Sequence, residues 1–295
     1  MASAELRDTR RRIKSVQATM KITRAMELIA ASRIPKAQAR VTASKPYTGK
    51  LIEVIRNVGA ASAGASHMLL ERREVKTVGV LLVSADRGLA GAYASSIIRL
   101  AESSIIQHRK AGREVRLFAI GKKAQGYFDY RGYHIERAFT GITDTPGYGD
   151  ARAIANVVMD AYADGRVDAV EAFYTRYDSA LTQTPVSFEL LPVEPPTGDG
   201  DAGGAEVASV DYNFEPSPGE ILQRLLPRYV EAIVFNMLLE SSASEHSARR
   251  RAMKAATDNA DELIRVLTNV ANRARQAEIT TEISEIVGGA EALNH

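Results

Sequence analysis

The chain of 295 residues contains no cysteine. This absence excludes disulfides, cysteine-ligated metal sites and thiol catalysis, and it fits a reducing compartment. Long apolar runs are missing too: no stretch approaches the ~20 residues of a membrane-spanning helix, and the N-terminus has no apolar signal core. Hydrophobic residues still make up 45% of the chain, which is enough for a folded core. We therefore expect a soluble protein that attaches to a membrane only indirectly.

Glycine and proline are missing from the sixty residues between Arg228 and Val287. At about 1.5 Å per residue this stretch predicts a helix of roughly 90 Å. A compact chain of this size has a diameter of only about 50 Å, so such a helix needs partners for its apolar face. We expect it to span 218–288, to begin near Pro218, to kink near Pro227 and to stop at Gly288-Gly289.

Apolar and small residues recur along this stretch at steps of three and four, which predicts a coiled-coil seam. The predicted seam residues are Ala248, Ala252, Ala255, Asn259, Leu263, Val266, Val270, Ala274 and Ala277. Its upper half is mostly alanine, which buries little area at ~25 cal/mol per Å². The helix is therefore expected to depend on surrounding protein.

Residues 1–58 predict a second long helix with two apolar stripes. Ile13, Val16 and Met20 form one stripe. The other holds Ile22, Met26 and Ile29, roughly 150° around the helix. Two nearly opposite apolar sides require two partners: the C-terminal helix and a surface outside this chain. The alternative is a helix buried in a bundle. Pro35 and Pro46 predict kinks or breaks in this helix.

Charge is distributed unevenly along the chain. The first fifty residues carry 12 Lys and Arg against three acidic residues, a net charge of +9, although the whole chain carries +2. A basic segment of this kind indicates an acidic partner, either nucleic acid, anionic lipid or an acidic protein surface. Since it lacks interleaved aromatics and any DNA-reading motif, we expect a solvated or protein-facing basic helix and no nucleic acid.

Residues 75–194 alternate strands with helices, which predicts an open, Rossmann-like α/β sheet. The expected strands are Thr77–Ser84, Glu114–Ile120, Tyr133–Phe139, Asp168–Tyr174 and Pro185–Leu191, and the expected helices are Ala92–Lys110, Lys122–Tyr130 and Ala151–Ala163. Residues 195–217, rich in Gly, Pro and Asp at their start, are expected to be a mobile loop and return linker.

Residue patterns for chemistry are weak or missing. The turn after the first strand holds Gly88 and Gly91, a G-x-x-G spacing that matches neither dinucleotide-binding nor P-loop motifs. The five histidines are scattered without metal-ligand spacing, and no nucleophile motif is present. Asp86 beside Arg87 is interpreted as an ion pair. We predict a non-catalytic chain with no cofactor and no metal.

Four stretches, in order, resemble the gamma-subunit family of rotary F-type ATP synthases. They are Ile13–Glu27 (IKSVQATMKITRAME), Ser84–Leu89 (SADRGL), Met253–Ala260 (MKAATDNA) and Asn272–Ile283 (NRARQAEITTEI). The resemblance runs from about residue 3 to Ala290. It implies that the terminal helices form a long antiparallel coiled coil, the central stalk, joined to a Rossmann-like domain.

The resemblance also implies partners and a role. One copy of the chain would turn inside a hexamer of alpha and beta subunits, with the epsilon subunit and the membrane c-ring at its foot. It would couple rotation to ATP synthesis or hydrolysis at the beta subunits, and regulate ATPase activity and proton flow. Its place is peripheral, on the cytoplasmic side of the cell membrane of a bacterium, and it performs no chemistry itself.

The family match assigns contact residues by position. Contacts with the beta catch loop and the apolar bearing fall on Met26, Arg275, Gln276, Thr280, Glu282, Ile283, Ile286 and Val287, with Ile279 also in the apolar tip. The basic face of the N-terminal helix consists of Arg7, Arg10, Arg11, Lys14, Lys21 and Arg24. Such charges attract acidic surfaces without fixed geometry.

Two other interpretations remain open from the residues alone. One is a coiled-coil adaptor whose Rossmann-like module has no connection to ATP synthase. The other is a nucleotide-using enzyme with a helical arm.

Overall fold

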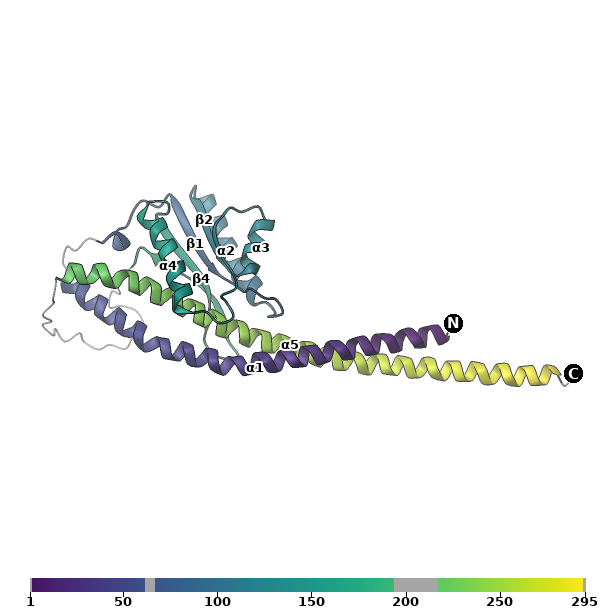
Figure 1. Ribbon diagram of the computed structural model, residues 1–295. Coiled ribbons are helices and arrows are strands. Elements are labelled where there is room, and N and C mark those ends of the chain that lie inside the picture. The colour runs from purple at the N-terminus through teal and green to yellow at the C-terminus, as the bar shows by residue number, and fades with distance from the viewer. Residues whose placement is uncertain (1, 62–66, 194–216, 294–295) are drawn as a thin grey trace. The chain divides into compact units, whose positions relative to one another are not determined.

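The computed structural model describes residues 2–61, 67–193 and 217–293 (Figure 1). The chain divides into two compact units. We call Met1–Ala31 with Arg249–His295 the helical unit, and Ser32–Ala248 the sheet unit. The mobile loop expected at 195–217 lies outside the described residues, apart from Ser217.

Two long helices run through both units. Helix α1 spans Ala2–Ala61 and α5 spans Pro218–Leu293. Contrary to expectation, Pro46 does not break α1 and Gly288-Gly289 does not end α5. An internal proline costs about 3 kcal/mol, but burial of Val41 and Leu51 on either side of Pro46 offsets that cost. Two glycines cost only about 1 kcal/mol each, and the Ala, Glu and Leu that follow favour helix.

The sheet unit contains five strands in the order β3-β2-β1-β4-β5. They are β1 (Thr77–Val83), β2 (Glu114–Ile120), β3 (Ile135–Phe139), β4 (Ala169–Tyr177) and β5 (Gln183–Leu191). The first four are parallel, and β5 pairs antiparallel with β4. The predicted open α/β sheet is confirmed; the antiparallel direction of its last strand was not predicted.

Helices cover both faces of the sheet (Figure 1). On one face, α2 (Tyr93–Lys110) and α3 (Lys122–Tyr130) pack on Val80 and Leu82 of β1. On the other, α4 (Tyr148–Ala163) and α5 pack on Leu81 and Val83. Successive side chains of β1 point to opposite faces of the sheet, and both faces are covered by apolar residues, which explains the continuous hydrophobic run of this strand. A short 3-10 helix, Met68–Leu70, precedes β1.

At the carboxyl edge of this sheet, Gly121 after β2 approaches the backbone of Ala85 after β1 closely. Gly121 adopts φ +94°, and a Cβ placed there would lie 2.8 Å from the backbone of Ala85. Replacing Gly121 with alanine is therefore expected to lower the free energy of unfolding by about 2 kcal/mol or more, measured by denaturant titration.

Gly126 is the matched control, because it lies inside α3 and a Cβ added there would meet no atom within 4 Å. Gly126→Ala is expected to leave stability unchanged or raise it by up to about 1 kcal/mol. Equal effects of the two substitutions would contradict the close approach at Gly121.

Candidate partner-binding surface

The helical unit is a pair of helices with a narrow internal seam. On α1 the seam repeats at steps of three and four through Leu6, Thr9, Ile13, Val16, Met20, Thr23, Glu27 and Ala30. Thr23 Oγ1 lies 2.8 Å from Thr257 Oγ1 of α5, so a polar contact fixes the pairing. The predicted stripe of Ile13, Val16 and Met20 is therefore half-buried in the seam.

The second predicted stripe of α1 faces outward. Ile22 is 61% exposed and Ile29 is 54% exposed, while Met26 is half-buried. Leu28, beside them, is also exposed. An apolar face of this kind on a long helix indicates a surface that another protein covers.

The seam predicted for α5 is wrong by one residue. Leu263, Val266 and Val270 are 46%, 49% and 39% exposed, and Ala255, Asn259 and Ala277 are exposed as well. The residues that face inward are Met253, Ala260, Ile264, Leu267 and Ala271. One residue corresponds to about 100° of rotation, so Leu263, Val266 and Val270 form a second outward apolar stripe instead. These three residues join the candidate surface, although their spacing had assigned them to the interior. Ala248, Ala252 and Ala274 of the predicted seam are half-buried.

A groove of about 670 Å³ lies between the two helices of this unit. Met20, Ala25 and Leu28 line its α1 side together with Lys21 and Arg24, and Thr257, Asp258 and Asp261 line its α5 side. Its rims thus carry opposite charges around an apolar floor. Arg24 is already paired with Glu27 at 3.1 Å and Asp258 with Lys254 at 3.1 Å, which leaves the groove with little net charge.

Within the described parts of the chain, no helix lies beside the end of α5. Counting outward from the Thr23–Thr257 contact places the start of α1 opposite about Glu278 (Figure 1). Every residue from Ile279 to Ala290 is exposed. Ile279, Ile283, Ile286 and Val287 recur at helical spacing and form an apolar stripe on this segment. A lone helix of about 12–15 residues is marginal in water, so this tip needs protein around it.

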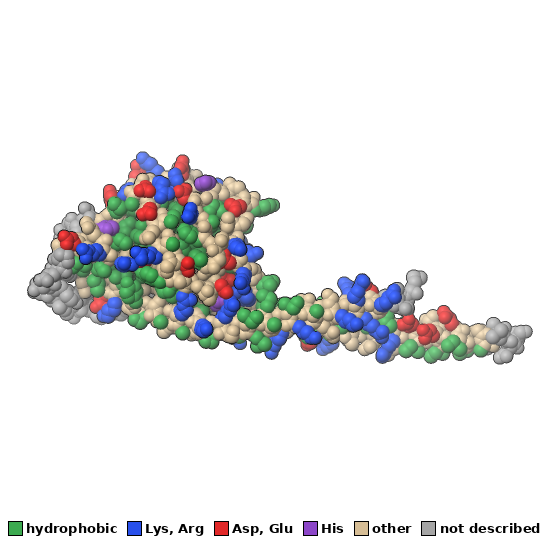
Figure 2. All heavy atoms as spheres, viewed as in Figure 1, with side chains coloured by type: hydrophobic (Ala, Val, Ile, Leu, Met, Phe, Trp, Pro, Cys, Tyr) green, Lys and Arg blue, Asp and Glu red, His purple; other side chains and the backbone are tan. Residues whose placement is uncertain are grey.

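The contact residues assigned from the family match all lie in the helical unit. Arg275, Gln276, Thr280 and Glu282 are exposed on α5, and Thr280 Oγ1 donates to the Gln276 carbonyl at 2.9 Å. The basic residues Arg7, Arg10, Arg11, Lys14, Lys21 and Arg24 are all exposed on α1. Figure 2 shows Lys and Arg gathered near the start of α1, followed by acidic side chains toward the end of α5. The unit therefore carries separate basic and acidic zones along its length.

The place where doubly wound sheets bind nucleotides is occupied by α5. In such folds the crevice lies at the carboxyl ends of the strands where the strand order reverses, here between β1 and β4. Ser244 Oγ of α5 donates to the Thr175 carbonyl of β4 at 3.2 Å. Ala248 packs on Ala85, Ala90 and Tyr93 around the turn after β1. These contacts use the space and the backbone groups that a nucleotide requires.

The turn after β1 is held by a carboxylate. Asp86 accepts hydrogen bonds from the Lys122 and Thr143 amides and from the Thr143 hydroxyl, each at 3.1 Å. Partial burial opposes its ionisation, but the hydrogen bonds from Gly141, Thr143 and Lys122 outweigh burial and lower the pKa of this carboxyl. The predicted ion pair is thus wrong: Asp86 is bonded to these groups, and Arg87 is exposed.

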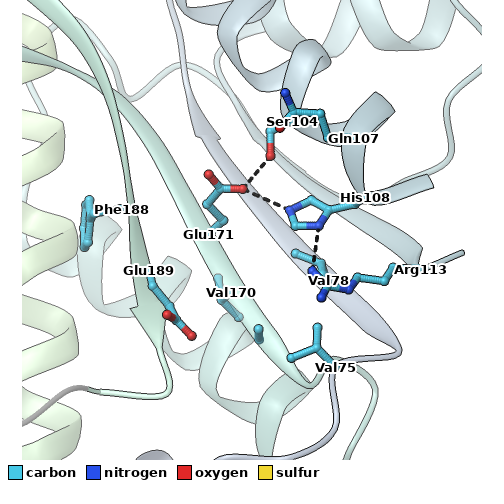
Figure 3. A pocket seen from close by; sticks show the side chains of 11 residues that line it. Val75, Val78, Ser104, Gln107, His108, Arg113, Val170, Glu171, Phe188 and Glu189 are labelled. Atoms are coloured by element: carbon cyan, nitrogen blue, oxygen red, sulfur yellow. Dashed lines mark hydrogen bonds and ion pairs between the residues drawn. The ribbon is translucent and has the colours of Figure 1, made fainter. Parts of the chain in front are cut away.

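A pocket of about 440 Å³ between α2, β4 and β5 holds the most enzyme-like side chains (Figure 3). Ser104 Oγ donates to Glu171 Oε2 at 2.6 Å, and His108 Nε2 lies 3.2 Å from the same oxygen. The serine therefore contacts the carboxylate and not the imidazole, whereas in a Ser-His-Asp triad the imidazole lies between the hydroxyl and the carboxylate. This cluster ties α2 to β4 and lacks the geometry of a catalytic triad.

The described part of the chain holds neither a metal cluster nor a membrane-spanning helix. No group of three or more His, Cys, Asp or Glu side chains within residues 2–61, 67–193 and 217–293 is arranged to hold a metal ion. Over the same ranges, none of the helices combines the length and the apolar character that crossing a bilayer requires.

Comparison with known proteins gives one family. A family model described as ATP synthase matches residues 5–293. The chain is 49% identical to the ATP synthase gamma chain of Kineococcus radiotolerans, over 99% of this chain and 97% of that relative. It is 46% identical to the ATP synthase gamma chain of Parafrankia sp., over 99% and 98% of the two chains.

Solved structures show the same fold. A chain of the Euglena gracilis mitochondrial ATP synthase (OSCP/F1/c-ring) aligns with a TM-score of 0.66 at 14% identity, over 99% of this chain and 95% of that one. A chain of the Tetrahymena thermophila mitochondrial ATP synthase central stalk and c-ring aligns with a TM-score of 0.61 at 24% identity, over 80% and 99%.

Proposed function

This chain belongs to the ATP synthase gamma-chain family and is therefore a non-catalytic rotor subunit of the central stalk. We propose that its helical unit is the shaft that turns against the catalytic subunits. The observation that supports this assignment most is the pair of outward apolar stripes. One stripe lies on α1 and one on α5, and both stay exposed when the two helices have paired. Surfaces of this kind are stable only inside an assembly.

We propose that the partners are a hexamer of alpha and beta subunits around the shaft, with the epsilon subunit and the c-ring at the sheet unit. One gamma chain serves each complex. As part of the membrane-associated F1 sector, the chain is proposed to be peripheral, on the cytoplasmic side of the cell membrane. Residues 1–58 and 218–288 are proposed as the two coiled-coil helices, whose parts within the helical unit are the shaft. Residues 75–194 are proposed as the Rossmann-like domain and 195–217 as the linker.

Rotation changes catalysis through contacts that differ with angle. A catalytic subunit shifts between states only when its partner binds those states unequally. The sides of the helical unit differ: the stripe with Ile22 and Ile29 is apolar, while the exposed Lys21 and Arg24, on another side of α1 at about 100° per residue, are basic. A turning shaft therefore offers each beta subunit a changing set of contacts, and no chemistry on the shaft is needed.

The proposed contact at Arg275 and Gln276 is tested by alanine substitution. Arg275→Ala with Gln276→Ala is expected to weaken binding to the alpha–beta hexamer at least about 30-fold, since each of the two charged or polar hydrogen bonds contributes about 1–3 kcal/mol. Both residues are exposed, so the chain should keep its melting temperature. Binding is measured by titration of the hexamer, together with its ATPase rate.

Lys254→Ala serves as the control, because Lys254 is exposed on the same helix and contacts Asp258 four residues away. It is expected to bind like the unchanged chain. If the double variant binds and activates the hexamer as well as this control does, Arg275 and Gln276 are not contact residues.

A further inference from the structure

The loop between β3 and α4, Thr140–Gly147, contacts three other parts of the sheet unit. We call it the joint loop. Toward the sheet, Thr143 is buried and its hydroxyl takes part in two hydrogen bonds with Asp86: it donates to Oδ2 at 3.1 Å and accepts from the Asp86 amide at 3.0 Å. The joint loop is thereby fixed to the turn that follows β1.

The other side of the joint loop binds the two long helices. Arg33 of α1 pairs with the Asp144 carboxylate, and Arg40 of α1 donates to the Pro146 carbonyl. From α5, Ser242 Oγ donates to the Asp144 carbonyl at 3.0 Å. One loop of eight residues therefore bridges the sheet, α1 and α5.

A row of polar side chains on α5 continues this attachment. Glu240 Oε2 accepts from the Tyr177 amide at 3.1 Å, and Ser244 Oγ donates to the Thr175 carbonyl. His246 Nε2 lies 3.2 Å from the Asp144 carbonyl. Along α5, the residues that contact β4 (Glu240 and Ser244) alternate with those that contact the Asp144 carbonyl (Ser242 and His246). In the same part of α5, Ser241, Ser242, Ser244 and His246 are all buried, which is unusual for polar side chains.

The remaining contact between the sheet and α5 has a different character. Leu222, Leu226, Val230 and Leu238 of α5 pack against α4 and the strands in one apolar cluster. Apolar contacts are non-directional, so they resist separation but only weakly resist tilting or sliding. Hydrogen bonds and ion pairs depend on distance and angle and therefore fix orientation.

We propose that the joint loop and the polar row of α5 hold the sheet, with α2, α3 and α4, at a fixed angle on the two long helices, and that torque passes between them through this joint. Only the transmission of torque rests on the proposed rotor function. The fixed angle is a property of the chain alone. Arg33, Arg40 and Ser242 are positioning residues in this account.

The fixed angle is tested first on the full chain. The sequence contains no cysteine, so Gln38→Cys on α1 and Ser103→Cys on α2, both exposed, give two unique spin-label sites. A variant with Arg33→Met, Arg40→Met and Ser242→Ala is expected to widen the measured distance distribution at least about twofold, because domains then rotate about their remaining interface. Arg131→Met, which removes an ion pair with Glu102 inside the sheet unit, is the control and should leave the width unchanged. An unchanged width in a triple variant that melts cooperatively overturns the proposal.

The torque is tested in membrane vesicles that hold the complete synthase. The triple variant is expected to pump about twofold fewer protons per ATP hydrolysed, while the Arg131→Met complex couples normally. Normal coupling in the triple variant refutes the role in torque. If the unchanged chain fails to activate the hexamer, that result would instead contradict the proposed function. The distance measurement would still test whether the joint loop and the polar row of α5 fix the angle of the sheet.

Discussion

Replacing Ile22 and Ile29 with aspartate is expected to prevent this chain from assembling with alpha and beta subunits. Both side chains are more than half exposed in the chain, so the variant should fold and melt like the original. In the proposed assembly the stripe is covered, and burying unpaired carboxylates costs several kcal/mol. Binding to the hexamer should weaken at least about 100-fold, which corresponds to about 3 kcal/mol. Native mass spectrometry of the mixed subunits measures the loss.

The control carries the same added charge on the same helix. Gln17 and Thr19 are exposed polar residues of α1, and Gln17→Asp with Thr19→Asp should reduce assembly far less. Assembly of the Ile22 and Ile29 variant at the level of this control would mean that the apolar stripe faces solvent in the complex.

Replacing Asp86 with alanine is expected to destabilise the sheet unit by about 3 kcal/mol or more, since charged hydrogen bonds contribute about 1.5–3 kcal/mol each and their donors would lose their acceptor. The carboxylate joins the turn after β1 to Lys122, the first residue of α3, and to Thr143 of the joint loop. Arg87→Ala is the matched control, because Arg87 is the exposed neighbour. If Asp86→Ala lowers the free energy of unfolding only slightly, or if Arg87→Ala lowers it equally, the result would support the ion pair between Asp86 and Arg87 that the sequence had indicated.

The contribution of Asp86 should also depend on pH. Its folded-state pKa lies below its ordinary value, because hydrogen bonds favour the charged form. The stabilisation is therefore fully present above the unfolded pKa of about 3.9, and it is lost as the pH falls from there through the folded pKa. The difference in unfolding free energy between the unchanged chain and Asp86→Ala should shrink below about pH 4. A difference that stays constant between about pH 7 and pH 3 would contradict a hydrogen-bonded carboxylate.

The sheet unit was predictable because its signals are local. Short apolar runs of valine and leucine marked the strands, and α2 and α3 end where the sequence predicted. The end of β4 was missed by three residues, since Thr175 and Tyr177 are held by α5 and not by a local pattern. The role of Asp86 was missed for the same reason: its donors lie 36 and 57 residues away.

The helical unit was only half predictable. The two stripes of α1 were identified correctly because both are strongly apolar and well separated. On α5 two apolar stripes lie one residue apart, and both have heptad spacing. Which one faces α1 depends on the contact between Thr23 and Thr257, which no periodicity reveals. The helix limit at Pro46 failed because a local penalty of about 3 kcal/mol is smaller than the packing on either side of it. The limit at Gly288 failed because two glycines cost only about 1 kcal/mol each.

The most direct test of the account is whether the chain rotates. A single cysteine at Ser103, exposed on α2 of a chain without native cysteine, carries a bead or gold particle, and the alpha–beta hexamer is fixed to glass. With ATP we expect stepwise rotation in one direction, and a higher ATPase rate than that of alpha and beta subunits alone. A hexamer that contains the chain and hydrolyses ATP while the particle stays at one angle would contradict the rotor, and would favour an adaptor that only binds.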